Sequence, residues 1–144
     1  GVVTGPDTTV GTDAALALAK IAAKVGITDD VRVFAAGDDA KTFTANIYVA
    51  ADHFEGGTIK PSKSAEIVAA HKAYVDSLPI GGDVLPAPDG DGSTGYVVFS
   101  EWTGAITNIE GVVAIGSPSP NNNSEVAANS VATVAAANFT YVAK

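Results

Sequence analysis

The stretch Ser64-Ala-Glu-Ile-Val-Ala-Ala-His-Lys-Ala-Tyr-Val-Asp-Ser-Leu78, followed at once by Pro79-Ile-Gly-Gly-Asp-Val84, decides the fold. Its apolar side chains recur at helical spacing, which predicts a long helix that the proline and the glycine pair bring to an end. The inner stripe of this helix consists of Ile67, Ala70, Tyr74 and Leu78, with His71 beside it. No residue of the stretch belongs to a catalytic motif, so we interpret it as framework.

Two further helices are predicted on either side of this one. The apolar stripe of the second consists of Phe99, Trp102, Ile106 and Ile109. We expect Ser100 to be its N-cap and Gly111 to end it, after which Val112–Ile115 is strand-like. Near the start of the chain, Thr12-Asp13 predicts the beginning of a helix that ends at Gly26.

Strands are predicted before the long helix and at the end of the chain. Val31–Phe34 is short and rich in β-branched residues, and a turn at Ala36–Asp39 separates it from Lys41–Ala51. The second of these alternates cleanly, so we expect one face to be buried and the other to meet water or a partner. The inner set is Phe43, Ala45, Ile47 and Val49, and the outer set is Thr42, Thr44, Asn46 and Tyr48. Asn138–Val142 is the strongest strand signal near the C-terminus.

The order of elements predicts an α+β fold, a small, mostly antiparallel sheet with about three helices packed on one face. A chain of 144 residues, 47% of them hydrophobic, fits one domain with a substantial core. We expect residues 1–11, rich in Gly, Thr and Pro, to form an extended N-terminal arm, and residues 12–144 to form the single domain.

Composition excludes several classes of function. Cysteine is absent, which excludes disulfides, thiolate metal sites and a cysteine nucleophile. The net charge is −8 and Arg32 is the only arginine, so nucleic acid is not an expected partner. The apolar runs are far too short to predict a membrane span. Methionine is absent even at position 1, so we expect a processed chain or a piece of a longer protein.

The candidate metal-binding residues do not form a complete site. Asp89, Asp91 and Ser93 have the alternating oxygens of a calcium loop, but Thr94 and Ser100 stand where that loop needs Gly and Glu. We therefore interpret the segment as an acidic turn, with a weak calcium site as the open alternative. The two histidines, His53 and His71, have no metal-ligand spacing, and Asp52 and Glu55 beside His53 do not supply one.

No catalytic motif or nucleotide loop is present. The Gly-x-Ser-x-Gly elbow, the dinucleotide fingerprint and the phosphate-binding loop are all missing. We expect no enzyme activity, no cofactor, no metal and no small-molecule substrate, and we look for contact surfaces instead. The candidate interface residues are Thr42, Thr44, Asn46, Tyr48, Trp102, Phe139 and Tyr141. Trp102, the only tryptophan, is interpreted first as a core residue and second as an interface anchor.

Several short segments follow one another in an informative order. They are Ile27–Val33, Phe43–Ala51, Tyr74–Val84, Trp102–Ile106, Ile109–Val113, Ser117-Pro118 and Glu125–Val131. In this order they resemble the C-terminal region of the baseplate J-like proteins of contractile phage tails and related injection systems. The similar family patterns are a Leu-Thr-Asp-x-Val-x-Val stretch, a helix ending in Leu-x-x-Gly-x-x-Val, a Gly-Val-x-x-Val strand and a closing Ser-Pro. The chain differs in having only one predicted helix and eleven leading residues before this region.

The resemblance implies a structural role in a virion. Such subunits join as wedges around the tail tube, so other copies of this chain and other baseplate or tail subunits are the implied partners. Ring assembly needs heterologous contact surfaces rather than active-site residues. The outer face of Lys41–Ala51 and the terminal strand are the candidate surfaces, the latter by strand addition.

Two other classes of function stay open. A chain with a small-residue composition and an extended Gly1–Gly11 arm also suits an exported filament, pilus or other virion subunit assembled by strand exchange, located outside the cell. A small-molecule enzyme or binding domain would need a pocket with convergent ionisable groups, and the sequence shows no sign of one.

Overall fold

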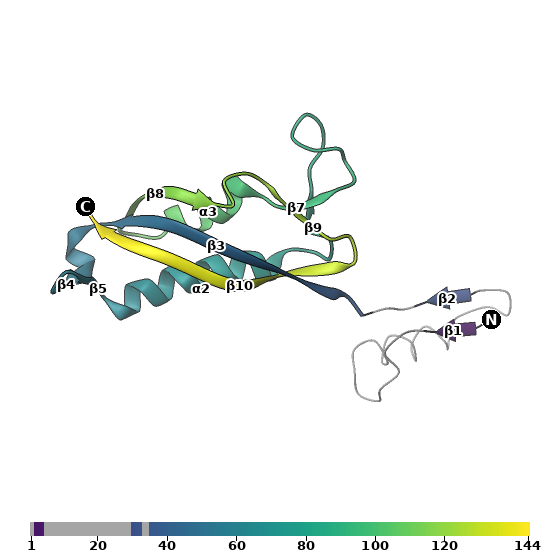
Figure 1. Ribbon diagram of the computed structural model, residues 1–144, viewed down its shortest axis with the longest axis horizontal. Helices are drawn as coiled ribbons and strands as arrows, with labels where there is room; N and C mark the ends of the chain where they lie inside the picture. The colour runs from purple at the N-terminus through teal and green to yellow at the C-terminus, as the bar shows by residue number, and fades with distance from the viewer. Residues whose placement is uncertain (1, 5–29, 33–34) are drawn as a thin grey trace. The chain divides into compact units, whose positions relative to one another are not determined.

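Figure 1 shows a computed structural model of the chain, which describes residues 2–4, 30–32 and 35–144. The chain divides into two compact units, Gly1–Gly37 and Asp38–Lys144. In the first unit, strand β1 (Val2–Thr4) pairs in parallel with β2 (Asp30–Arg32). β2 confirms a strand at the start of the predicted Val31–Phe34. The helix expected between Thr12 and Gly26, and the domain boundary expected after Gly11, lie outside the described residues.

The second unit is built on a three-stranded sheet with two helices on one of its faces (Figure 1). The strands are β3 (Gly37–Val49), β8 (Val112–Ser119) and β10 (Ser130–Ala143), in the order β10-β3-β8. The helices are α2 (Pro61–Ser77) and α3 (Phe99–Thr107). A mixed α+β fold is therefore correct, with two helices in the described part of the chain.

The sheet is mixed, where a mostly antiparallel one was expected. β3 and β8 are antiparallel, with Ile47 opposite Ile115. β10 runs parallel to β3: the Lys144 N–H donates to the Val49 carbonyl (2.9 Å), and the Lys144 carbonyl accepts from the Ala51 N–H (3.2 Å). Lys144 therefore bonds the residues on either side of Ala50, which is the hydrogen-bond pattern of parallel strands. The arrows of β3 and β10 also point the same way in Figure 1. The long connection through both helices permits this direction.

β3 begins earlier than the sequence predicts, because the expected turn at Ala36–Asp39 is largely strand. The Asp39 carboxylate accepts the Ala127 N–H (2.9 Å) and pairs with the Lys41 ammonium (2.9 Å). Lys41 in turn donates to the Glu125 carbonyl (2.6 Å). These bonds join the start of β3 to a segment of the same chain up to 88 residues away and hold β3 extended there. They also lower the pKa of the Asp39 carboxyl below its ordinary value.

The two helices follow the predicted stripes with shifted starts. α2 begins at Pro61, which suits the first helical turn because its missing N–H would be unpaired there. α3 is preceded by Val98, and the predicted N-cap Ser100 lies inside its first turn, so that prediction is wrong. The Phe99 N–H instead donates to the Asn123 side chain (2.9 Å), a cap supplied by a distant loop.

Shorter strands complete the second unit. A second sheet has the order β6-β7-β9, and a hairpin is formed by β4 and β5 after the 3₁₀ turn η1. Their bounds are η1 Ala51–His53, β4 Phe54–Glu55, β5 Thr58–Ile59, β6 Asp83–Val84, β7 Gly95–Val97 and β9 Ser124–Val126. The acidic turn around Asp91 thus lies in the loop between β6 and β7, and Gly56 and Gly57, both at positive φ, form the turn between β4 and β5.

The core lies between the main sheet and the two helices. Its fully buried larger side chains are Phe43, Ile47, Val49, Ile67, His71, Val75, Val97, Trp102, Ile106 and Val126. The inner face of β3 was thus predicted correctly, because a period of two is a strong signal on a half-buried strand. Within the described part of the chain, no helix is long and apolar enough to cross a membrane.

Candidate interaction surface

The face of the main sheet opposite the helices is open and uncharged along the middle of β3. Thr42 is exposed, and Thr44, Asn46 and Tyr48 are half-buried, whereas the alternate residues of the strand are buried. In the described part of the chain no helix lies over this face (Figure 1). We call the four residues Thr42, Thr44, Asn46 and Tyr48 the outer face. The structure therefore places these four predicted residues together on one surface.

Tyr48 is the largest side chain of the outer face, and its position is fixed by neighbours on both sides. A Cβ on Gly116 of β8 would lie 3.0 Å from the Tyr48 ring, so the ring covers that glycine. The Lys144 ammonium lies 5.9 Å from the ring centroid. This distance falls within the range of a cation–π interaction, worth about 0.5–1 kcal/mol at an exposed site. The outer face thus presents one aromatic ring held between a backbone and a cation.

Trp102 does not belong to an interaction surface, because its side chain is completely buried. Its ring meets those of Phe43 (5.4 Å between centroids) and Phe99 (6.1 Å) edge to face. The interpretation of Trp102 as a core residue is confirmed, and its alternative use as a surface anchor is wrong. The physical reason is that the stripe of α3 faces the sheet, where an aromatic ring removes the most apolar area from water.

Phe139 and Tyr141 lie on the helix side of the terminal strand rather than on its outer side. Both are partly buried against the core, and the Phe139 ring lies 5.4 Å from that of His71. The exposed residues of this part of β10 are Asn138, Thr140 and Val142, which alternate with them. The side chains of Phe139 and Tyr141 therefore complete the core. A partner protein could contact β10 only through its backbone edge and through the alternate residues.

His71 is enclosed by aromatic rings and is completely buried. The Phe43 ring lies 4.3 Å from the imidazole, and those of Phe139 and Trp102 lie 5.4 and 5.7 Å away. Neither ring nitrogen has a hydrogen-bond partner within the described residues. Burial lowers the pKa of His71 from 6.5 to about 4, since a charged imidazole would lose its water there. His71 is thus a neutral core residue of α2, held in a cage of aromatic rings.

His71 should make the protein less stable in mild acid. The unfolded chain binds a proton on this residue near pH 6.5, while the folded chain resists it until about pH 4. Stability is therefore complete above the unfolded value and falls as the pH decreases, by about 2 kcal/mol between about pH 7.5 and about pH 5. Urea unfolding at a series of pH values measures this change.

The matched variant for this measurement is His71→Leu. It keeps an apolar side chain in the cage and removes both unpaired nitrogens, so we expect equal or higher stability at neutral pH and a flatter curve down to about pH 5. An unchanged pH dependence in His71→Leu would show that other groups cause the acid effect.

The acidic turn forms its own hydrogen bonds. The Asp91 carboxylate accepts the backbone N–H groups of Ser93 (2.8 Å) and Thr94 (2.6 Å) and the Thr94 hydroxyl (2.8 Å). These bonds lower the pKa of Asp91 below its ordinary value. The carboxylate closes a turn, as the sequence interpretation had it. Among the described residues no group of three or more His, Cys, Asp or Glu side chains is placed to hold a metal ion.

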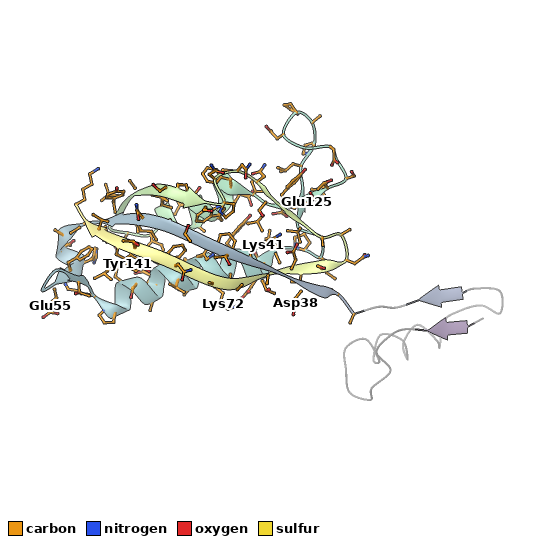
Figure 2. The ribbon with its side chains drawn as sticks, viewed as in Figure 1. Asp38, Lys41, Glu55, Lys72, Glu125 and Tyr141 are labelled. Carbon is orange, nitrogen blue, oxygen red and sulfur yellow. The ribbon has the colours of Figure 1, made fainter. Side chains whose placement is uncertain are left out.

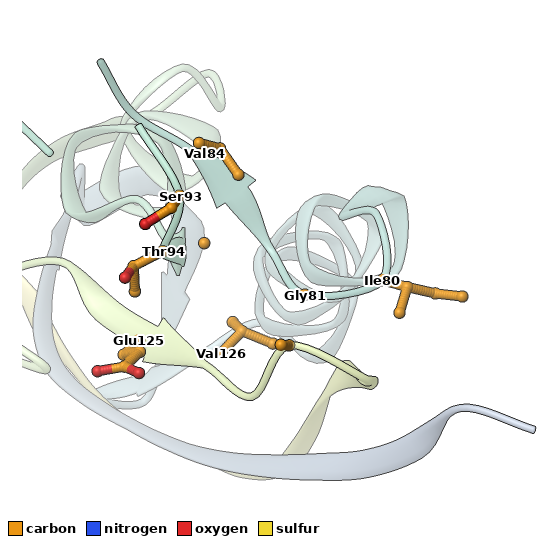
Figure 3. Close-up of a pocket in the computed structure, with 9 residues that line it drawn as sticks. Ile80, Gly81, Val84, Ser93, Thr94, Glu125 and Val126 are labelled. Carbon is orange, nitrogen blue, oxygen red and sulfur yellow. The ribbon is translucent and has the colours of Figure 1, made fainter. Parts of the chain in front are cut away.

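A cavity of about 210 Å³ lies beside the second sheet, β6-β7-β9, which we call the small sheet (Figure 3). Two of its lining residues, Ile80 and Val84, are 62% and 53% exposed, and its polar side chains are those of Ser93, Thr94 and Glu125. Glu125 is the only ionisable lining residue, so the cavity lacks the convergent charged groups of a catalytic site.

Some features of this surface had little or no signal in the sequence. The cap from Asn123 and the bonds of Asp39 and Lys41 to β9 join segments far apart in the chain. The exposed Ile80 had a weak signal, because it sits between a proline and a glycine pair where no apolar stripe continues. Only the proximity of these segments in the fold reveals their roles.

Neither a protein-family model nor a curated protein matches this chain.

Proposed function

We propose that this chain is a structural subunit of the baseplate of a contractile phage tail or related injection system. It acts as a wedge component, through contacts with other copies of itself and with other baseplate subunits of the virion. The outer face carries this proposal. It consists of Thr, Asn and Tyr side chains and has no charge of its own, apart from the Lys144 ammonium over the Tyr48 ring, in a chain whose net charge is −8. Subunit interfaces are depleted of charge at their centre and enriched in tyrosine, as this face is.

The residues that carry the resemblance support the same proposal through their framework roles. Gly81 and Gly82, which follow α2, have φ values of 83° and 76°, a region open mainly to glycine. Gly111 has a φ of 82°, and a Cβ there would overlap the His53 imidazole. Its carbonyl accepts the Ala50 N–H (2.8 Å) at the end of β3. These glycines allow the turns that fix the path of the backbone. A subunit that acts through its contact surfaces needs such a fixed backbone more than it needs reactive groups.

The proposed subunit has no enzyme activity and needs no cofactor. The perturbed ionisable groups of the described structure support this, because each is explained by packing or by its turn. Asp39 accepts the Ala127 N–H just after β9, Asp91 closes a loop and His71 is enclosed by aromatic rings. Burial against the core raises the pKa of Tyr141. Burial also raises the pKa of Tyr74 to about 12, and its hydroxyl accepts the Val98 N–H (3.0 Å) before α3.

The test is incorporation into particles in the native source. We expect electron microscopy with a label on this chain to place it in a ring at the tail tip. The double variant Asn46→Glu, Tyr48→Glu should fold but reduce incorporation at least about tenfold, because the contact would bury two carboxylates without partners. Quantitative mass spectrometry of purified particles measures the incorporated fraction.

The matched control is the double variant Ala69→Glu, Ala73→Glu, which adds the same two negative charges to exposed positions of α2. It should be incorporated normally. Absence of the unaltered chain from every ring or tail particle would contradict the proposed function, and normal incorporation of the outer-face variant would contradict the proposed surface.

A filament assembled by strand exchange is the competing function. It depends on the arm Gly1–Gly11, of which the structure describes Val2–Thr4 as β1, paired with β2. Deletion of residues 1–11 separates the two: a filament that depends on a donor strand would no longer form, whereas a wedge would keep the contacts of the second unit.

A further inference from the structure

β10 forms an edge of the main sheet, and no strand of the described residues pairs with its second side (Figure 1). The strand is 14 residues long and contains no charged residue, no proline and no glycine. Proteins usually protect such edges with charges, prolines, bulges or a covering segment, because unpaired N–H and C=O groups recruit another strand. The other edge, β8, has Pro118, register shifts and Ser117 at a φ of 48°. The β10 edge has none of these residues. Its core-facing side chains change from Ala132 and Val134 to Phe139 and Tyr141, so the regular, unprotected part of this edge is its end, residues 138–143.

The backbone of β10 offers its free groups at defined positions. Lys144 bonds β3 through both its N–H and its carbonyl. Because these groups alternate in direction along a strand, Ala143, Tyr141 and Phe139 direct theirs away from β3. A second strand placed there would pair these groups without disturbing the existing ladder.

Apolar side chains also lie along this margin. Val142 of β10 is 37% exposed and Val68 of α2 is 38% exposed. Val68 precedes Lys72 by one helical turn, and Figure 2 shows Lys72 along the margin next to β10. Lys72 is paired with Asp76 on the same helix. Val142 lies on the outer side of the sheet and Val68 on its helix side, so an exposed apolar side chain borders the β10 edge on each face.

The two ends of the β10 edge differ in charge. At the C-terminal end Lys144 lies beside Ala51 and Asp52, and the charges of Lys144 and Lys60 are balanced by those of Asp52 and Glu55 (Figure 2). At the other end Asp38, Asp39 and Glu125 outnumber Lys41, so this end is acidic. An antiparallel second copy keeps the two acidic ends apart. A parallel copy would place them together.

We propose that β10 pairs with β10 of a second copy of this chain, antiparallel and across a two-fold axis. The two three-stranded sheets then form one continuous sheet of six strands. Both α2 helices lie on the same face of that sheet, where the two Val68 side chains cover each other's margin. The pairing is isologous, so it closes at a dimer. It is independent of the proposed baseplate role, because it requires no other subunit.

Sedimentation velocity of the whole chain from about 5 to about 500 µM tests this pairing. We expect a concentration-dependent species with twice the mass of one chain. Hydrogen exchange at high concentration should slow at the amides of Phe139, Tyr141 and Ala143. The double variant Val142→Lys, Ala143→Pro removes one outward N–H and adds a charge, and it should weaken the dimer at least about tenfold.

The matched control is Val113→Lys on the opposite edge, where Val113 is 52% exposed. It should dimerise as the unaltered chain does, and thermal melting should show both variants folded. A chain that stays monomeric at the highest concentration overturns the proposal, as does a dimer that survives the β10 variant or is weakened equally by Val113→Lys. A monomer that nevertheless enters baseplates would leave the proposed function standing while this pairing fails.

Discussion

Replacement of Gly95 by alanine is expected to destabilise the protein by about 3 kcal/mol or more. A Cβ on this residue would lie 2.7 Å from the carbonyl carbon of Gly81 and 2.9 Å from the Gly82 carbonyl oxygen. Both neighbours are backbone atoms that cannot rotate away. The segment after α2 would therefore have to move from β7, and the edge of the small sheet would open. Urea unfolding followed by circular dichroism measures the loss.

Two glycine controls separate the causes of that loss. Gly92 has a φ of 75° but open space around it, so Gly92→Ala should cost only the conformational strain, about 1–2 kcal/mol. Gly104 lies within α3 and also has open space, so Gly104→Ala should stabilise the protein by about 0.5–1 kcal/mol. If Gly95→Ala costs no more than Gly92→Ala, the close approach of these backbones is wrong.

Replacement of Trp102 by alanine is expected to cost about 4 kcal/mol of stability. The ring is fully buried between α3 and the sheet and contacts Phe43, Phe99 and His71, so its removal leaves a large cavity. Thermal or urea unfolding of the variant gives the value.

Two further variants sharpen this measurement. The indole Nε1 of Trp102 has no hydrogen-bond partner among the residues described, so Trp102→Phe loses no bond and should cost less than about 1.5 kcal/mol. Tyr48→Ala, on the outer face, should cost less than about 1 kcal/mol because Tyr48 is only half-buried. Equal losses for Trp102→Ala and Tyr48→Ala would contradict the assignment of one residue to the core and the other to a surface.

The elements with a strong period were predictable from the sequence. Each of these elements has one face in contact with the core, and this fixes the spacing of its apolar residues. The alternation from Phe43 to Val49 and the stripe of α2 around Ile67 and His71 are examples. The end of α2 at Ser77 was also predictable, because Pro79 cannot continue a helix. The outer face followed from the same alternation, so this part of the candidate surface needed no structure.

Other features required segments that are far apart in the chain. Ser100 had the right side chain for a cap, but Asn123 supplies it, because the loop before β9 passes the start of α3. The turn expected at Ala36–Asp39 became strand through bonds from Asp39 to Ala127. Phe139 and Tyr141 were expected at a contact surface, but the direction of their side chains depends on the pairing of β10 with β3.

The sequence by itself determined the local elements and the buried and open faces of β3, because backbone preference and apolar periodicity depend on neighbouring residues. The lack of cysteine also excluded thiol chemistry. Only the tertiary structure decided the parallel direction of β10, its unprotected edge, the aromatic cage of His71 and the contact of Gly95 with Gly81. Each of these depends on which distant segments meet. That outcome is set by the total burial and hydrogen bonding of the whole domain, which no short stretch of sequence contains.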